Sequence, residues 1–279
     1  MTEACRPGWP TADAEQLEEL LGLAVDLACA AGQLQEQRLW QARQVETKSS
    51  ASDLVTDVDR ACERLIVGRL RESRPDDSVV AEEGTLWEAK TGVRWVIDPL
   101  DGTTNYVYGY PAFAVSIAVE IDGRARIGVV FDSSSGHCYR AVEGWGAFCD
   151  EQPIRARHLG DLPHAVLGTG FSYDPEQRER QGRVLTAMLS RVSDIRRSGS
   201  ASLDLCHVAA GHLDGFFELD LALWDYAAGA VIAREAGAEV AFPESAHGLG
   251  PAVVVANGSL MAPLLGLLAE AEALAPGTY

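Results

Sequence analysis

The most informative stretch of the chain is WVIDPLDGTTNY, residues 95–106. An apolar run ends at Asp98, and a second carboxylate follows at Asp101. Pro99 fixes its own φ and disfavours helix at Asp98, so we expect a strand that ends abruptly there. Two carboxylates at the carboxyl end of a strand can converge on one cation, because their oxygens suit Mg²⁺ or Mn²⁺.

The Gly-Thr-Thr segment, residues 102–104, follows directly. Backbone N–H groups at a helix start there would attract a phosphate oxyanion. Asp-Pro and Asp-Gly are also common turn formers, so a plain loop is the alternative interpretation. Metal ligands beside anion-binding amides favour phosphate-ester chemistry.

Four further blocks accompany this stretch: KSSASDLVTDVDR (48–60), VVAEEG (79–84), RRSGSASLDLC (196–206) and FFELDLALWDYAAG (216–229). Together with DPLDGTTN they resemble, in the same order, the signature blocks of the inositol monophosphatase family. These are metal-dependent phosphomonoesterases related to fructose-1,6-bisphosphatase. The resemblance runs from about residue 14 to the end of the chain. It implies an α/β fold in which helix layers and sheet layers alternate, with an active cleft between two halves.

The chain has 279 residues, of which 47% are hydrophobic and 23% charged, which is ordinary for a globular protein with a substantial core. We expect a disordered segment over residues 1–12, an N-terminal half over 13–158 that carries the metal motifs, and a C-terminal half over 159–279. The absence of a long apolar run or an apolar leader predicts a cytoplasmic protein that does not enter membranes. The six cysteines lack zinc-like spacing and are expected to be reduced and structural. A formal net charge of −18 disfavours nucleic acid and suits a cation site.

Hydrophobic periodicity predicts the elements. A helix is expected from an N-cap at Asp13 to Leu34, a second from about Asp59, and a loop or hairpin over 47–57. Strands are expected on both sides of an Asp122-Gly123 turn, and then over 137–143 and 145–150. The second half alternates strands (164–171, 194–198, 215–219, 238–242, 252–256) with helices (176–192, 200–212, 224–237, and from 259).

The resemblance implies the metal ligands. Glu82, Asp98 and the carbonyl oxygen of Leu100 would hold a first ion. Asp98 would also bridge to a second ion, which Asp101 and Asp225 would complete, and a third, weaker ion would share Glu82. Two or three Mg²⁺ ions are expected, with Mn²⁺ as a possible substitute, because all of these ligands are oxygens.

The resemblance also implies the catalytic groups. A water near Glu82 and Thr103 would attack phosphorus, and Asp59 would pair with Thr103 and align that water. The alternative role of Asp59 is an N-cap at its helix start. Asp53 matches a common acidic position of the family. Lys48 matches a lysine near the metals, with a solvated loop lysine as the alternative.

Substrate contacts are expected from Gly102 and Thr103 on one side of the cleft. Gly199, Ser200 and Ala201 match the loop that contacts the alcohol, Glu218 matches a glutamate that accepts hydrogen bonds from substrate hydroxyls, and Asp225 adjoins the substrate. The chain departs from the animal pattern at two positions, because Ala222 replaces a usual histidine and Asp220 adds a negative charge. These departures weaken the prediction that inositol is the preferred alcohol.

Several residues close to these blocks are expected to play no part. Glu83, Asp57 and Asp220 are expected on solvated faces, and Arg196 and Arg197 as a surface pair. The Gly168-Thr169-Gly170 segment lacks a full phosphate-loop pattern. The histidines are expected to be structural or at the surface: His137, His158, His164, His207, His212 and His247.

The expected function is hydrolysis of inositol 1-phosphate or a similar small phosphorylated polyol, by a homodimer. Histidinol phosphate and fructose 1,6-bisphosphate are alternative substrates. The nucleotide 3′-phosphoadenosine 5′-phosphate is disfavoured, because no basic and aromatic cluster is present to hold it. A non-catalytic factor associated with RNA polymerase is the alternative from a different class of protein, and the complete set of carboxylates favours catalysis over it.

Overall fold

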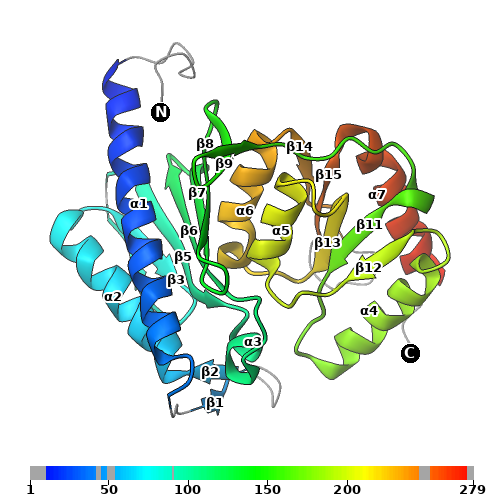
Figure 1. Ribbon diagram of the computed structural model, residues 1–279, viewed down its shortest axis with the longest axis horizontal. Helices are drawn as coiled ribbons and strands as arrows, with labels where there is room; N and C mark the ends of the chain where they lie inside the picture. Colours follow the sequence, from blue (N-terminus) through cyan, green and yellow to red (C-terminus); the bar gives the residue numbers. More distant parts are fainter. Residues whose placement is uncertain (1–10, 42–44, 49–53, 90, 245–251, 275–279) are drawn as a thin grey trace.

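The computed structural model describes residues 11–41, 45–48, 54–89, 91–244 and 252–274. Helices and sheets alternate in five layers: α1 and α2, an eight-stranded sheet, α5 and α6, a five-stranded sheet, and α4 with α7 (Figure 1). The layered α/β fold expected from the sequence is therefore confirmed. Residues 1–10 lie outside the described residues, whereas Thr11 and Ala12 already belong to α1.

The first layer consists of α1 (Thr11–Arg38) and α2 (Asp57–Ser73). The N-cap predicted at Asp13 is wrong, because α1 already includes Thr11 and Asp13 lies inside the first turn. An N-cap at Asp59 is also wrong, because Thr56 caps α2. The Thr56 hydroxyl accepts the backbone N–H of Val58 at 3.1 Å, and the Asp59 carboxylate accepts the backbone N–H of Thr56 at 2.9 Å. Asp59 is therefore the third residue of a capping box.

The eight-stranded sheet has the order β10-β9-β8-β7-β6-β5-β3-β4. Its strands are β3 (Ser78–Ala81), β4 (Leu86–Trp87), β5 (Val93–Asp101), β6 (Ala114–Ile121), β7 (Arg124–Asp132), β8 (His137–Val142), β9 (Gly146–Cys149) and β10 (Gln152–Ile154). Only the β3–β5 pair is parallel among these neighbours. Asp122 and Gly123 both have positive φ, 52° and 77°, so the predicted hairpin between β6 and β7 is confirmed.

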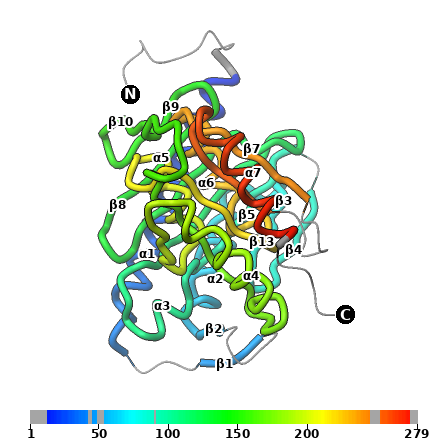
Figure 2. Tube along the Cα trace, turned by 90° about the vertical axis from the view of Figure 1, so that its right-hand side faces the viewer, coloured from blue at the N-terminus to red at the C-terminus, as the bar shows by residue number. Residues whose placement is uncertain are grey.

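The five-stranded sheet has the order β12-β11-β13-β15-β14. Its strands are β11 (Val166–Thr169), β12 (Asp194–Arg196), β13 (Gly215–Leu219), β14 (Ala238–Ala241) and β15 (Ala252–Asn257). On its outer face lie α4 (Pro175–Met188) and α7 (Gly258–Leu274), as Figure 2 shows from the side. The helix α4 ends before the predicted limit at residue 192. Short elements complete the description: β1 (Val45–Thr47) paired with β2 (Leu54–Thr56), α3 (Thr103–Tyr108) and a 3₁₀ turn (Leu162–His164).

The middle layer joins the two sheets. It consists of α5 (Ala201–Ala209) and α6 (Leu223–Glu235), which share one apolar cluster with residues from both sheets. Strand β7 and helix α6 lie so close together that a Cβ on Gly128 of β7 would be 2.3 Å from the carbonyl oxygen of Ala228 in α6. Both sheets thus bury apolar surface against the same two helices. Residue 158 lies between the last strand of the eight-stranded sheet and the first strand of the five-stranded sheet. The division of the chain into two halves at this residue stays a prediction.

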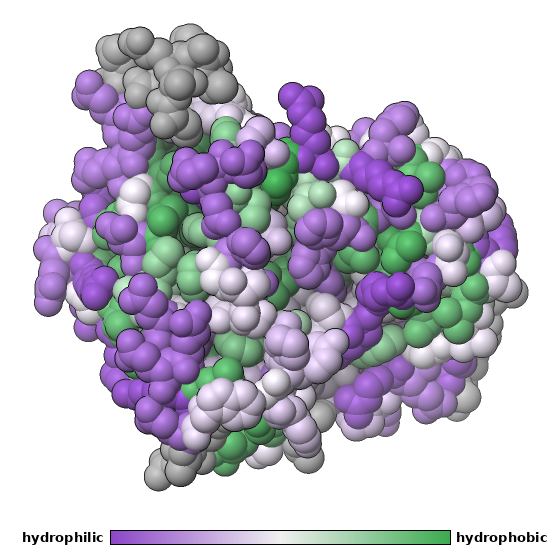
Figure 3. Space-filling view, in the orientation of Figure 1, coloured by the Kyte–Doolittle hydropathy of each residue, from purple (hydrophilic) through white to green (hydrophobic). Residues whose placement is uncertain are grey.

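Polar and apolar side chains are interspersed over the face seen in Figure 3. In the part of the chain that the structure describes, no helix has the length and apolarity to cross a membrane.

Candidate active site

A cavity of about 450 Å³ opens where the ends of β3, β5 and β13 face the N-termini of α5 and α6. Its lining includes these predicted site residues: Lys48, Glu82, Asp98, Leu100, Asp101, Gly102, Thr103, Gly199, Ser200, Ala201, Glu218 and Asp225. Asp59 lies outside the lining and reaches the cavity through Thr103. None of the described lining residues is a histidine.

Glu82 and Asp98 meet because two strands run parallel. Ala81 of β3 pairs with Ile97 of β5, and the backbone N–H of Glu82 extends the pairing to the carbonyl oxygen of Ile97 at 3.1 Å. The next residue of each strand therefore carries a carboxylate at the same sheet edge. A register shift between Asp98 and Asp101 then turns the chain, so that Asp101 also lines the cavity.

Asp101 is fixed by the second half of the chain. Its Oδ2 accepts hydrogen bonds from the Ser200 hydroxyl at 2.6 Å, the Ser202 hydroxyl at 2.5 Å and the Ser202 backbone N–H at 2.8 Å. Ser200 is also the N-cap of α5. Sequence reasoning missed Ser202, although a pair of serines at a helix start was the available signal.

Asp225 is fixed by its own helix. It is the third residue of α6, and its Oδ2 accepts the backbone N–H of Ala222 at 2.7 Å. Ala222 is the N-cap and offers no side-chain hydrogen bond. The Asp225 carboxylate thus accepts a hydrogen bond from Ala222, the residue that stands in place of the histidine of the animal pattern.

Asp98, Asp101 and Asp225 share an environment that opposes negative charge. Burial raises the pKa of Asp98 well above its usual value, and the charges of Glu82, Asp101 and Asp225 raise it further. Burial likewise raises the pKa of Asp225 and of Asp101, against the hydrogen bonds that Asp101 receives from Ser200 and Ser202. A divalent cation would relieve this repulsion, and an all-oxygen donor set suits Mg²⁺ or Mn²⁺. The residues present therefore fit the metals that the family resemblance implies.

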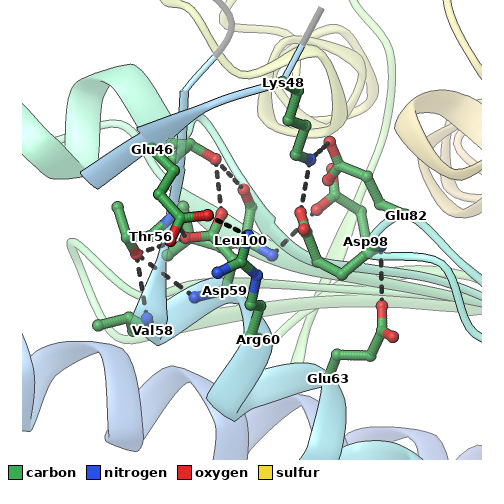
Figure 4. Close-up of polar contacts among 12 residues, drawn as sticks. Glu46, Lys48, Thr56, Val58, Asp59, Arg60, Glu63, Glu82, Asp98 and Leu100 are labelled. Atoms are coloured by element: carbon green, nitrogen blue, oxygen red, sulfur yellow. Dashed lines mark hydrogen bonds and ion pairs between the residues drawn. The ribbon is translucent and has the colours of Figure 1, made fainter. Parts of the chain in front are cut away.

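Lys48 balances part of this charge. Its Nζ lies 2.9 Å from Glu82 Oε1, as Figure 4 shows, and 2.5 Å from Glu83 Oε1. Burial opposes the charge on Lys48, but the two glutamates together raise its pKa above the usual value. The expectation of a solvated Glu83 is wrong, because its side chain is only 6% exposed and its pKa is raised to about 7, chiefly by burial. Both glutamates lie in the turn that follows β3, and both contact the same lysine.

Thr103 and Asp59 form the predicted pair. The Thr103 hydroxyl lies 2.8 Å from Asp59 Oδ1 and 3.1 Å from the carbonyl oxygen of Leu100. The other oxygen of Asp59 accepts from the Thr56 hydroxyl at 2.5 Å. Burial raises the pKa of Asp59, and these hydrogen bonds work against that rise. The capping box of α2 therefore also orients a hydroxyl at the cavity wall.

Two glycines let the loops of the two halves meet. Gly102 and Gly199 have φ of 87° and 92°, a region that favours glycine. A Cβ on Gly102 would lie 2.7 Å from the carbonyl oxygen of Ala112. Asn105 ties the loops together, since its Nδ2 donates to the carbonyl oxygens of Ala112 at 2.7 Å and Ser198 at 2.9 Å. Ser200 and Ala201 follow directly and line the cavity.

Glu218 lines the cavity with both carboxylate oxygens against Gly170. A Cβ on Gly170 would lie 2.1 Å from Glu218 Oε1 and from Oε2, so only glycine leaves this space. Burial raises the pKa of Glu218 well above its usual value, and the Asp225 charge adds to the rise, while Arg197 opposes it. Gly170 and Tyr173 are among the lining residues that sequence reasoning missed, because only the fold brings the end of β11 beside β13.

The remaining sequence predictions concern charged residues near the cavity, the histidines and the cysteines. Arg196 and Arg197 are both exposed, as expected; Arg196 pairs with Asp194 at 2.6 Å, and Arg197 also lines the cavity. Asp220 is exposed as expected, yet it also lines the cavity. Asp57 is half-exposed in the first turn of α2. Asp53 and His247 lie outside the described residues, as does Cys5, and the five described cysteines are free thiols.

A model of the inositol monophosphatase family matches residues 16–274. The chain belongs to this family. The chain is 45% identical over 243 residues to the inositol-1-monophosphatase of Mycobacterium leprae. This match covers 83% of this chain and 84% of that protein. It is 44% identical over 227 residues to the Nus factor SuhB of Vibrio cholerae, covering 80% of this chain and 85% of that protein.

Among solved structures, the extragenic suppressor protein suhB from Bartonella henselae is similar with a TM-score of 0.83 at 34% identity. The match covers 90% of this chain and 98% of that chain. Family membership indicates a phosphatase, and the family is in general metal-dependent.

Proposed function

We propose that this protein is a Mg²⁺-dependent phosphomonoesterase that hydrolyses inositol 1-phosphate or a similar polyol phosphate. The observation that carries the proposal is that four carboxylates line one cavity: Asp98 and Asp101 are buried, and Glu82 and Asp225 are partly buried. Burying so many like charges is costly unless cations accompany them. The same cavity borders the N-termini of α5 and α6, whose partial positive charge favours an anionic substrate.

Glu82, Asp98 and the Leu100 carbonyl oxygen would hold one ion, and Asp98 would share the second with Asp101 and Asp225. When bound, such a pair of ions activates water and stabilises the leaving oxygen of a phosphate ester. Lys48 contacts both Glu82 and Glu83 beside this group and balances part of their charge.

Thr103 is the residue proposed to orient the attacking water. Its hydroxyl can donate to Asp59 Oδ1, at 2.8 Å, and then its oxygen accepts from the water. The other oxygen of Asp59 accepts a hydrogen bond from Thr56. The Asp59 carboxylate is therefore held in place and in turn restrains the Thr103 rotamer. The water is thereby presented to the phosphate that the backbone N–H groups after Gly102 would bind.

The alcohol of the substrate would occupy the part of the cavity between Ala201 and Glu218. A buried carboxylate accepts hydrogen bonds from hydroxyls and rejects analogues that lack them. Asp220 adds a negative charge on this side, and Arg197 a positive one. Histidinol phosphate and fructose 1,6-bisphosphate therefore remain the alternative substrates.

The experiment is a panel of phosphate esters with the purified protein and Mg²⁺. Inositol 1-phosphate or another polyol phosphate should give the highest kcat/KM, and the Asp98→Asn variant should lose turnover of every ester. A protein that releases phosphate from none of them with Mg²⁺ or Mn²⁺ would contradict the proposal.

A second candidate rests on the relative named Nus factor SuhB, at 44% identity. This candidate is an association with RNA polymerase, independent of catalysis. Pull-down of polymerase by both wild type and the Asp98→Asn variant would support it, because the variant keeps the surface and loses the chemistry.

A further inference from the structure

A second group of potential metal ligands lies outside the cavity. His137 begins β8, Cys149 ends β9, and Asp150 follows it. One donor atom from each residue lies within 4.8 Å of the others. The antiparallel pairing of Tyr139 with Cys149 brings these two strand ends together. We refer to His137, Cys149 and Asp150 as the β8–β9 site.

The carboxylate of this site is already held in place. Asp150 has a left-handed backbone conformation with φ of 51°, and its N–H donates to the carbonyl oxygen of Cys138 at 2.8 Å. Its Oδ1 accepts the backbone N–H of Cys138 at 2.9 Å, and its Oδ2 lies 2.8 Å from Nδ1 of His137. Because His137 Nδ1 and Asp150 Oδ2 already lie in contact, a cation bound by both would replace this hydrogen bond.

The donor types select the ion. One imidazole nitrogen, one thiolate and one carboxylate oxygen are the ligands of zinc and related d-block cations, whereas Mg²⁺ and Ca²⁺ take oxygen alone. Tetrahedral zinc separates such donors by about 3–4 Å, which the cluster accommodates. A thiolate and a carboxylate together also balance the charge of a divalent ion. Three protein ligands leave the fourth position to water.

The β8–β9 site is accessible and separate from the cavity. The His137 and Asp150 side chains are 56% and 48% exposed, so an ion can reach them. Strands β6 and β7 lie between β8 and β5, which carries Asp98. Three inter-strand spacings amount to about 14 Å, so the two sets of ligands cannot share an ion.

We propose that the β8–β9 site binds one zinc ion, or a related d-block divalent cation, and thereby joins the ends of β8 and β9. The site differs in chemistry from the carboxylate cavity. Its occupancy is therefore independent of the phosphatase proposal.

Co²⁺ is the probe that distinguishes the two sites, because only a thiolate ligand produces sulfur-to-cobalt charge-transfer absorption. Co²⁺ is added to the full chain in excess Mg²⁺, and the near-ultraviolet band is followed to saturation. Wild type and Asp98→Asn should both bind one equivalent with this band. Cys149→Ser should lack the band, and His137→Ala should bind more than about tenfold more weakly.

Cys29→Ser is the matched control. The Cys29 thiol is in hydrogen-bond contact with that of Cys138, and this pair is the competing soft ligand near β8. The proposal predicts that Cys29→Ser keeps the band. Loss of the band in Cys29→Ser, its survival in Cys149→Ser, or its absence from wild type would overturn the proposal. Because His137 is exposed, His137→Ala tests the site even if Cys149→Ser fails to fold, and unchanged affinity there would also overturn it.

Zinc itself provides a second measurement. In the Asp98→Asn background, one equivalent of Zn²⁺ should raise the Tm, and adding His137→Ala should abolish the rise. An equal rise with and without His137 would place the ion elsewhere and overturn the proposal.

Discussion

Asp98 is the side chain on which the proposed chemistry depends most. It is buried among three other carboxylates, and it would serve both ions. Asp98→Asn should lower kcat by several orders of magnitude, because an amide is a weaker and neutral ligand. Steady-state kinetics with saturating Mg²⁺ measure this loss.

The same substitution has a stability readout that separates lost chemistry from lost fold. Burial and like charges raise the pKa of Asp98 in the folded protein, so its ionised form opposes folding at neutral pH. Metal-free Asp98→Asn should therefore melt no earlier than metal-free wild type. Turnover within about tenfold of wild type would refute the two-metal assignment.

Glu218 is expected to touch the alcohol and not the metals. Glu218→Gln keeps one acceptor and presents an amide donor in place of the other, so it should lose a charge-assisted hydrogen bond to a substrate hydroxyl. That loss is worth about 1.5–3 kcal/mol, or roughly ten- to a hundredfold in kcat/KM for inositol 1-phosphate. p-Nitrophenyl phosphate lacks these hydroxyls, so its kcat/KM should change little. Equal losses on both substrates would assign Glu218 to the metal site or the fold.

At the scale of elements, α1 offers a matched pair of glycines. A Cβ on Gly32 would lie 2.2 Å from Cδ1 of Phe131 in β7, whereas one on Gly22 would meet nothing within 4 Å. Gly32→Ala should therefore destabilise the protein by about 1–3 kcal/mol through overpacking. Gly22→Ala should stabilise it by roughly 0.5–1 kcal/mol, because alanine is the better helix former.

Urea unfolding of both variants and wild type tests how tightly α1 packs on the sheet. A stabilising Gly32→Ala would mean that α1 lies farther from β7 than described. The pair also controls for helix propensity, since both glycines occupy the same helix.

The two halves of the molecule are joined by hydrogen bonds beside the cavity. Ser200 and Ser202 of one half bind Asp101 of the other, and α5 and α6 pack between both sheets. Ion binding to ligands from both halves should therefore stabilise the entire molecule. We expect Mg²⁺ to raise the Tm of wild type and to have a much smaller effect on Asp98→Asn.

Activity should follow the same ions. Excess chelator should abolish it, Mg²⁺ should restore it, and high Ca²⁺ should inhibit, because Ca²⁺ favours larger and looser coordination. The family resemblance implies inhibition by Li⁺ as well. Full activity in chelator would contradict the metal proposal, while indifference to Li⁺ would count only against kinship with lithium-sensitive members. The homodimer and the cytoplasmic location stay predictions.

The sequence by itself determined the family, the layered fold and the residues placed at the cavity. These follow from local order, because DPLDGTTN ends a strand, places two carboxylates and starts a helix within one short stretch. The Asp122-Gly123 turn likewise needs only its own two residues, which both take positive φ.

Only the tertiary structure decided which distant side chains meet. Glu83 was expected in solvent, but Lys48 comes from another segment to bind it. His137 and Cys149 show no zinc spacing in the sequence, and strand pairing alone brings them together. Hydrophobic periodicity reports which face of an element is buried, whereas pairing across elements depends on packing that no local pattern encodes.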